Sequence, residues 1–267
     1  MLGPRANFGI KRDTRIIALL VWFRSRNSLD TMRRDVANFS IITLDALARR
    51  LATSVSCLPG TRPMSSSDGA GAPPPHLQML PQGWVAEVVT YLEMRTPPPR
   101  RPETAVGLAL RRMPADVGEY RRLFRRVGEA WLWASQLRRS DAELGAVLAS
   151  QAVETFALFA GTDEIGLLQL DFRSVGACEL AFFGVVPEAI GIGAGRFLMN
   201  RAIEQAWNRT PGIERFWVHT CTNDHPEALG FYVRSGFAPY ARGIECYPDP
   251  RIEGLLPKQA APQIPII

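Results

Sequence analysis

The sequence is nearly devoid of lysine. Lys11 and Lys258 are its only two, although Lys and Arg together number 31 in the 267 residues. A P-loop needs a Gly-Lys-Ser/Thr triplet, so this shortage excludes a P-loop nucleotide site. The chain also lacks an apolar run of the roughly 18 residues needed to span a bilayer. We therefore expect neither a P-loop enzyme nor a membrane partner.

Cysteine and histidine are scarce as well, with four and three residues respectively. The cysteines show no C-x-x-C spacing, and the few histidines do not complete a recognisable metal-ligand set. We therefore predict no metal site, reduced thiols and a cytoplasmic protein. The residues concerned are Cys57, Cys178, Cys221, Cys246, His76, His219 and His225.

Positive charge is concentrated near the N-terminus. Residues 1–63 hold eleven Lys plus Arg against four Asp plus Glu, or +7, which leaves 20 against 22, or −2, and the two sum to the chain's +5. Because the remainder is slightly acidic, we expect no nucleic-acid partner. We interpret residues 1–78 as a basic extension and linker, either disordered or the product of an over-extended reading frame. Residues 79–247 would form the catalytic domain and 248–267 a proline-rich tail.

Strand and helix patterns alternate from Trp84 onward, which predicts an α/β fold. Asp116-x-x-Glu119 and Ser140-x-x-Glu143 are capping-box spacings that mark two helix starts. The expected strands are 84–93, 105–113, 153–159, 165–172, 180–186 and 215–220. The expected helices run from Asp116 to about Leu137, from Ser140, from Arg196 to Trp207 and over 226–235.

A glycine-rich turn connects the strand at 180–186 to the helix after it. It reads Gly191-Ile192-Gly193-Ala194-Gly195 and follows Pro187. The first N–H groups of a helix lack internal partners, and glycines let a phosphate approach them closely. A dinucleotide fingerprint is excluded, because Arg196 stands where its third glycine belongs. The turn alone is compatible with a phosphate site or with a turn that binds nothing.

A second motif, Ala228-x-x-x-Tyr232-x-x-x-Gly236-Phe237, follows further on. In this order the two motifs resemble the signatures of the GNAT superfamily of N-acetyltransferases, over roughly residues 105–247. The family's loop reads [QR]-x-x-G-x-[GA], so Ile190 departs from it while Gly193 and Gly195 match. The resemblance implies the GNAT fold: a mixed, mostly antiparallel sheet, splayed at its central strands, with helices on both faces.

The resemblance also assigns roles. Acetyl-coenzyme A would be the co-substrate, with its pyrophosphate held by the loop. Tyr232 would protonate the leaving thiolate, Glu179 would be the base, and the backbone of Val185 and Val186 would polarise the thioester carbonyl. The residues implied in coenzyme binding are Val185, Val186, Ile190, Gly191, Gly193, Ala194, Gly195, Arg196 and His225.

Each role has a structural alternative. Tyr232 is equally suited to a core position, and Glu179 to a solvated strand end. His225 fits a helix-entry turn, and His219 a packed strand histidine. Trp131 or Trp133 could contact the acceptor, although aromatic residues on helices usually belong to the core.

The resulting hypothesis is direct acetyl transfer to the amine of a small molecule or protein within a ternary complex. A non-catalytic acyl-coenzyme A sensor or interaction module is the alternative, and a transferase for longer acyl chains is a third option. A homodimer is a possible assembly of such a protein.

Overall fold

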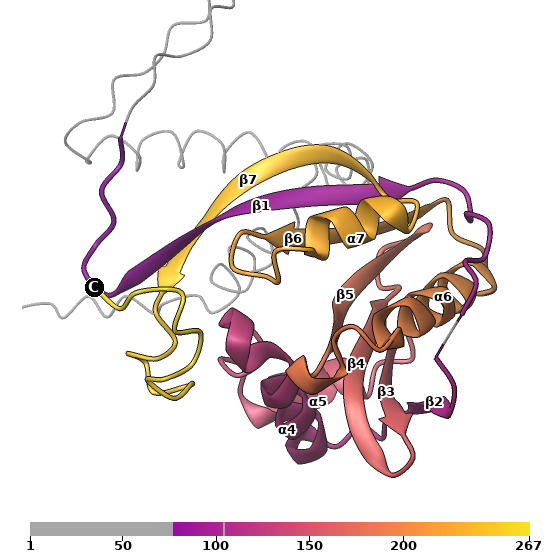
Figure 1. The fold of residues 1–267 in the computed structure, drawn as a ribbon, viewed down its shortest axis with the longest axis horizontal. Helices are drawn as coiled ribbons and strands as arrows, with labels where there is room; N and C mark the ends of the chain where they lie inside the picture. Colours follow the sequence, from indigo (N-terminus) through magenta and orange to yellow (C-terminus); the bar gives the residue numbers. More distant parts are fainter. Residues whose placement is uncertain (1–76, 104) are drawn as a thin grey trace, which may run out of the picture. The chain divides into compact units, whose positions relative to one another are not determined.

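The computed structural model describes residues 77–103 and 105–267. The expectations for residues 1–76 therefore lie outside the described part of the chain. Figure 1 labels the elements, which are β1 (Trp84–Met94), β2 (Leu108–Arg112), α4 (Val117–Gly128), η2 (Glu129–Trp131), α5 (Asp141–Leu148), β3 (Val153–Ala160), β4 (Asp163–Asp171), β5 (Ala177–Val185), η3 (Pro187–Ala189), α6 (Ala194–Trp207), β6 (Arg215–Cys221), α7 (Ala228–Arg234) and β7 (Ala238–Pro248).

One seven-stranded sheet organises the domain, in the order β2-β3-β4-β5-β6-β1-β7. Neighbouring strands are antiparallel except β5 and β6, which are parallel. This confirms the mixed, mostly antiparallel sheet expected from the sequence. β1 lies between β6 and β7 whereas β2 lies at the far edge, so the segment between them must cross the molecule.

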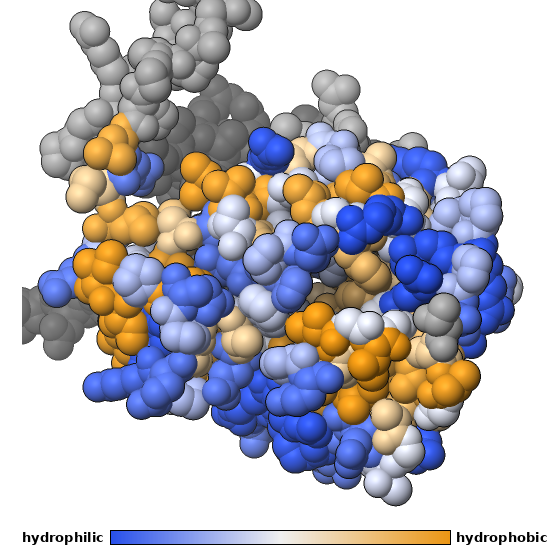
Figure 2. All heavy atoms as spheres, in the orientation of Figure 1, coloured by the Kyte–Doolittle hydropathy of each residue, from blue (hydrophilic) through white to orange (hydrophobic). Residues whose placement is uncertain are grey.

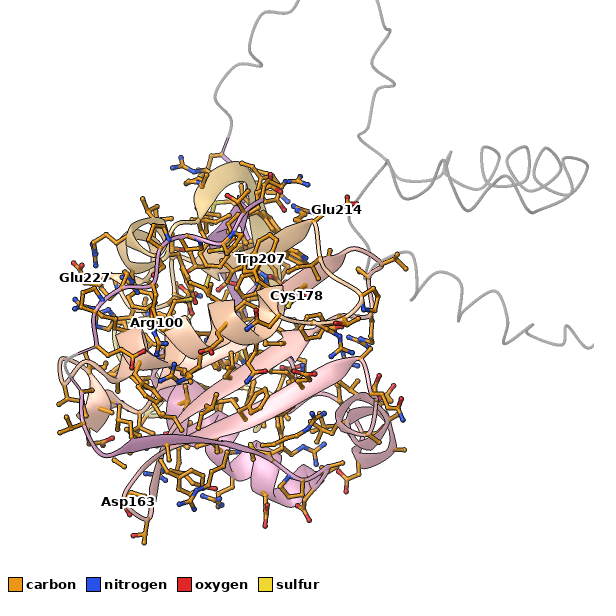
Figure 3. The ribbon with its side chains drawn as sticks, turned by 90° about the vertical axis from the view of Figure 1, so that its right-hand side faces the viewer. Arg100, Asp163, Cys178, Trp207, Glu214 and Glu227 are labelled. Atoms are coloured by element: carbon orange, nitrogen blue, oxygen red, sulfur yellow. The ribbon has the colours of Figure 1, made fainter. Side chains whose placement is uncertain are left out.

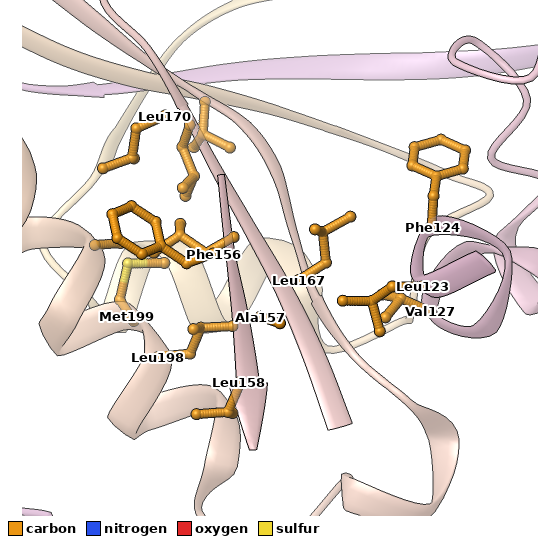
Figure 4. Close-up of a cluster of buried hydrophobic side chains, with 14 of the residues drawn as sticks. Leu123, Phe124, Val127, Phe156, Ala157, Leu158, Leu167, Leu170, Leu198 and Met199 are labelled. Atoms are coloured by element: carbon orange, nitrogen blue, oxygen red, sulfur yellow. The ribbon is translucent and has the colours of Figure 1, made fainter. Parts of the chain in front are cut away.

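Helices cover both faces of the sheet. On α4, buried residues recur at Tyr120, Leu123, Phe124 and Val127, the spacing of an amphipathic helix. Figure 4 shows Leu123, Phe124 and Val127 near Leu167 of β4, whereas Leu198 and Met199 of α6 lie with Phe156 on the other side of the strands. Successive strand residues point to opposite faces, so between Leu167 and Asp171 the odd-numbered residues of β4 face α4 and the even-numbered ones face α6.

The parallel strands β5 and β6 stay together for only a short distance. Residues 177–179 pair with residues 215–217, whereas β5 continues along β4 as far as Val185. Beyond Glu179 the two strands diverge, as Figure 1 shows. Opposite Gln169 and Leu170 the register shifts, which leaves Ala181 as an extra residue in β5. The predicted splay is therefore present, and it opens at Glu179.

The first predicted helix is shorter than expected. It ends at Gly128 instead of near Leu137, and η2 and a turn follow. Leu132 takes a left-handed conformation (φ 56°) and returns the chain, so that a Cβ on Gly128 would lie only 2.4 Å from Cβ of Trp133. This close approach requires glycine and ends the helix.

The predicted proline-rich tail, residues 248–267, folds back on itself in a series of turns. After β7, which the sequence did not predict, Asp249 and Arg251 form an ion pair with side chains only 2% and 1% exposed. The Arg251 guanidinium also donates to the carbonyls of Ala260, Ala261 and Ile264. A buried charge needs such partners, and here they fold the segment into a compact turn structure.

Candidate active site

The glycine loop has the backbone of an anion site. Gly191 and Gly193 both have φ of 88°, a left-handed conformation that favours glycine. Gly193 is the N-cap of α6 and provides no side-chain hydrogen bond, and the first internal bond runs from the Phe197 N–H to the Gly193 carbonyl. The N–H groups of Ala194, Gly195 and Arg196 therefore begin the helix without internal acceptors. This arrangement fits a pyrophosphate.

The backbone of β5 alternates between its two neighbours. The Val186 N–H donates to the Ile165 carbonyl at 2.9 Å, so it is not free to polarise a thioester, and that expectation needs correction. Because antiparallel residues alternate in the direction of their N–H groups, those of Val185 and Phe183 point away from β4. They face the gap left by β6, where a carbonyl could accept from them.

Tyr232 lies at this gap, on the inner face of α7. It is 7% exposed, and its ring is 6.1 Å from that of Phe183 and 5.9 Å from that of Phe237. Burial, reinforced by the negative charge of Asp224 and by Cys221, raises the pKa of Tyr232 above its ordinary value. The hydroxyl therefore stays protonated at neutral pH and is available as a hydrogen-bond or proton donor.

Glu179 is the last β5 residue paired with β6. Burial raises the pKa of Glu179 to about 7, with a further increase from Asp171 and an opposing effect of Arg173. Asp171 lies directly across the β4–β5 pair, and Arg173 donates to both of its carboxylate oxygens. His219 Nδ1 lies 3.9 Å from Glu179 Oε1. A carboxylate with this pKa exchanges protons near neutrality, as a general base must.

Tyr232 and Glu179 lie on opposite faces of the sheet. Phe183 packs toward α7, whereas Phe182 contacts Phe124 of α4, with ring centroids 5.0 Å apart. The Tyr120 hydroxyl of α4 donates a hydrogen bond to Gln169 Oε1 of β4 at 3.4 Å. Asp171 lies two residues further along β4 and therefore on the same face of the sheet as Gln169. Glu179, opposite Asp171, therefore faces the α4 side. A molecule in the gap can therefore be reached by Tyr232 from the α7 side and by Glu179 from the α4 side.

Trp133 connects the two arms of the splayed sheet on the α4 side. Its indole N–H donates to Asp224 Oδ1 at 3.1 Å, and its ring lies 5.6 Å from that of Phe182. Asp224 Oδ2 also accepts from the Thr220 hydroxyl and the Cys221 N–H. A Cβ on Gly184 would lie 3.2 Å from the Trp133 ring and 2.6 Å from Val127, so glycine leaves the space for this ring. Trp133 thus forms part of the wall opposite Tyr232.

His225 lies at the start of α7 on this same side. Its ring is 5.3 Å from that of Trp131, and its Nδ1 accepts the Glu227 N–H at 3.1 Å. These contacts match the helix-entry turn left open by the sequence. They place His225 beside Trp131.

Two hollows adjoin these groups. Figure 2 shows the surface recessed where Figure 1 draws β5, below α7. Another hollow of about 360 Å³ lies beside the end of β5 and is bordered by the C-terminal segment. It is lined by Arg126, Glu129, Ala130, Val186, Pro187, Glu188, Gln259, Ala260, Ala261 and Pro262.

The comparison with known families agrees with this geometry. Residues 120–237 match the acetyltransferase (GNAT) family. The chain contains a GNAT domain. No curated protein matches the sequence significantly.

Solved structures resemble the chain only distantly. A GCN5-related N-acetyltransferase from Kribbella flavida is 17% identical, with a TM-score of 0.43, over 63% of this chain and 60% of that one. A functionally unknown conserved protein from Staphylococcus epidermidis ATCC 12228 is 13% identical, with a TM-score of 0.42. The match covers 62% of this chain and 64% of that one. The chain thus spans less than two thirds of either protein. An acetyltransferase from Thermus thermophilus is 16% identical, with a TM-score of 0.39, over 54% and 99%.

Several neighbours in the GNAT domain were missed by the sequence reasoning. His219 is not packed away but has a 42% exposed side chain beside Glu179. The parallel pairing of Glu179 with Trp217 places residue 219 nearby, a signal that exists only once the register is known. Asp171 reaches the site in the same way, through its pairing with Glu179 on the neighbouring strand.

Within residues 77–103 and 105–267, no group of three or more His, Cys, Asp or Glu side chains is placed to hold a metal ion. No helix in those ranges is long and apolar enough to cross a membrane.

Proposed function

We propose that the protein is an acetyl-coenzyme A-dependent N-acetyltransferase that transfers the acetyl group directly to an amine. The observation that carries this proposal is the placement of Tyr232 and Glu179 on opposite faces of the sheet, at the gap between β5 and β6. An acid and a base on opposite sides suit two substrates that enter from opposite sides. The GNAT family match supports the same conclusion.

On the α6 and α7 side, the chain supplies groups for the coenzyme. When bound, acetyl-coenzyme A supplies an acetyl group activated as a thioester. The N–H groups at the start of α6 would hold its pyrophosphate, and those of Phe183 and Val185 would donate to the thioester carbonyl. Such donors stabilise the negative charge that develops on that oxygen.

Protons move at two named atoms. A Glu179 carboxylate oxygen accepts one proton from the attacking amine, directly or through water, and the Tyr232 hydroxyl donates one to the leaving sulfur. The raised pKa of Glu179, about 7, lets it take up a proton without remaining permanently protonated. A cationic amine would first release one proton to solvent, and Glu179 would take the second as the C–N bond forms and the C–S bond breaks. Tyr232 would then regain its proton from Glu179 through solvent.

The acceptor side is acidic. Besides Glu179, it carries Asp224 and Glu87, and the Glu87 carboxylate accepts from the Tyr247 hydroxyl at 3.0 Å and from Asn223 Nδ2 at 2.8 Å. Burial is the largest cause that raises the pKa of Glu87. These carboxylates favour a cationic amine over an acidic acceptor. Either a small molecule or a protein side chain satisfies that chemistry.

Calorimetric titration of the full chain with acetyl-coenzyme A and with free coenzyme A is the direct test. We expect saturable binding of both, followed by thiol release when cationic amines are added. Binding without thiol release for any amine would favour a non-catalytic acyl-coenzyme A sensor. If the folded protein binds neither compound, the proposal is wrong.

A further inference from the structure

The segment that connects β1 with β2 crosses the α6 and α7 side of the sheet. The Asn200 side chain of α6 donates to the Arg101 carbonyl at 2.8 Å, and Arg196 donates to the Pro102 carbonyl at 3.3 Å. A Cβ on Gly236, just after α7, would lie 3.0 Å from Pro98. Arg100, which Figure 3 labels, belongs to this crossover. The crossover therefore runs over both helices that border the gap.

The guanidinium of Arg101 is partly buried and lacks a complete set of partners. Its Cζ lies 5.3 Å from the centroid of the Phe231 ring, while its Nε and Nη2 have no hydrogen-bond partner in the part of the chain that the structure describes. The next residue back behaves differently, because Arg100 is 59% exposed and forms an ion pair with Glu103. Buried charged donors without acceptors are costly and therefore uncommon in folded proteins.

Other positive charges lie close by. Burial, together with the charges of Arg196 and Arg234, lowers the pKa of Arg101 from its ordinary value. Arg196 belongs to the first turn of α6, the turn whose N–H groups point outward. The only ion pair of Arg234 among the described residues is with Glu227, at 3.5 Å on the exposed surface. Three guanidinium groups thus share one region, and Arg101 lacks an anion to pair with among the residues that the structure describes.

The position of Arg101 links this region to the glycine loop. Phe231, over which the guanidinium stacks, lies 3.8 Å from the Cβ position of Gly195 in the first turn of α6. We propose that Arg101 binds a phosphate group of the coenzyme with its Nε and Nη2, which completes the loop's anion site from a separate segment. This inference rests on the proposed function. A guanidinium matches a phosphate because it donates two parallel hydrogen bonds to neighbouring oxygens.

The test measures binding by calorimetry for the wild type, Arg101→Met, Arg101→Lys and the control Arg100→Met, each as the full chain. The ligands are coenzyme A, dephospho-coenzyme A and inorganic pyrophosphate. We expect Arg101→Met to weaken coenzyme A binding by about tenfold or more, as the loss of a charge-assisted hydrogen-bond pair predicts. Arg101→Lys should fall between the wild type and Arg101→Met, and Arg100→Met should bind like the wild type.

If Arg101 had only a structural role, Arg101→Met would lower the melting temperature of the ligand-free protein. Methionine keeps the stem over Phe231 but removes an unpaired buried charge, so ligand-free Arg101→Met should melt at or above the wild-type temperature. A lower melting temperature together with unchanged coenzyme binding would overturn the proposal.

The ligand series identifies the phosphate. If Arg101→Met loses affinity for coenzyme A but not for dephospho-coenzyme A, the ribose phosphate is the partner; equal losses for both point to the pyrophosphate. Wild-type affinity of Arg101→Met for all three ligands would overturn the assignment of Arg101 alone. If the wild type binds none of them, the proposed function fails as well.

Discussion

The two faces of the splayed strand β5 carry unbalanced charges of opposite sign. Toward α6 and α7, Arg101 has buried nitrogens with no hydrogen-bond partner among the described residues. Toward α4, burial and the neighbouring Asp171 raise the pKa of the Glu179 carboxyl to about 7. One face thus suits phosphates, and the other suits an amine that must lose a proton. Each face thus holds a group whose charge is costly in the free protein, and the substrates proposed above would relieve that cost.

Removal of the Tyr232 hydroxyl should have the largest effect. Phenylalanine keeps the ring against Phe183 and Phe237 but cannot protonate the leaving sulfur, so we expect Tyr232→Phe to lower kcat by about 10² to 10⁴. Coenzyme affinity should stay within about tenfold, because packing is preserved. Steady-state kinetics with calorimetry will separate the two quantities. Equal kcat in the two proteins would end the assignment of Tyr232 as the acid.

Glu179→Gln tests the opposite face. A base must be deprotonated to act, so the wild-type rate should rise with pH and level off above about 7, the pKa of Glu179. We expect the variant to lose about 10² in kcat and to lack this rise. A variant that keeps the same pH profile would show that another group, such as His219, titrates instead.

The same substitution should affect stability with a defined sign. The folded-state pKa of Glu179, about 7, exceeds the ordinary 4.5, so the folded protein loses stability as pH increases between these values. The full difference corresponds to about 3 kcal/mol, and glutamine avoids it. Denaturant unfolding should therefore find Glu179→Gln more stable than the wild type at pH 8 but not at pH 4. If the free energies of unfolding of Glu179→Gln and the wild type differed by the same amount at every pH, the burial of this charge would be contradicted.

A change in the glycine loop should affect the coenzyme face alone. Gly193 has φ of 88°, which valine adopts only under strain, and a side chain would obstruct backbone approach. We expect Gly193→Val to weaken coenzyme binding by about tenfold or more. Gly161→Val is the matched control, because Gly161 has φ of 62° with nothing within 4 Å of its Cβ position, in a distant hairpin. Equal coenzyme affinity in the two variants would show that the loop is misassigned.

The two faces also differ in how well the sequence predicts them. The glycine loop and Tyr232 lie in contiguous motifs whose spacing shows in the chain itself, and most strands follow from local patterns. Glu179 could be singled out, but its neighbours Asp171 and His219 come from other strands and depend on register. The C-terminal turn structure was missed because Arg251 stabilises it through tertiary contacts that composition does not show. The Val186 N–H was misassigned because its partner, Ile165, lies in the next strand.

The smallest expected effect concerns Trp133, which separates acceptor binding from coenzyme binding. Phenylalanine would keep the contact with Phe182 but remove the hydrogen bond to Asp224, whose carboxylate still accepts from Thr220 and Cys221. The loss of one such bond is worth about 1 kcal/mol, so KM for the amine should rise about fivefold while coenzyme affinity is unchanged.

Trp207→Phe is the matched control for this substitution. The Trp207 indole nitrogen is buried without a hydrogen-bond partner among the described residues, so no bond is lost. If Trp133→Phe instead weakens the binding of the amine and of the coenzyme equally, the indole supports the whole gap between β5 and β6 and not the acceptor side alone. The two faces would then be coupled through this one side chain, and the separation of acid from base would depend on it.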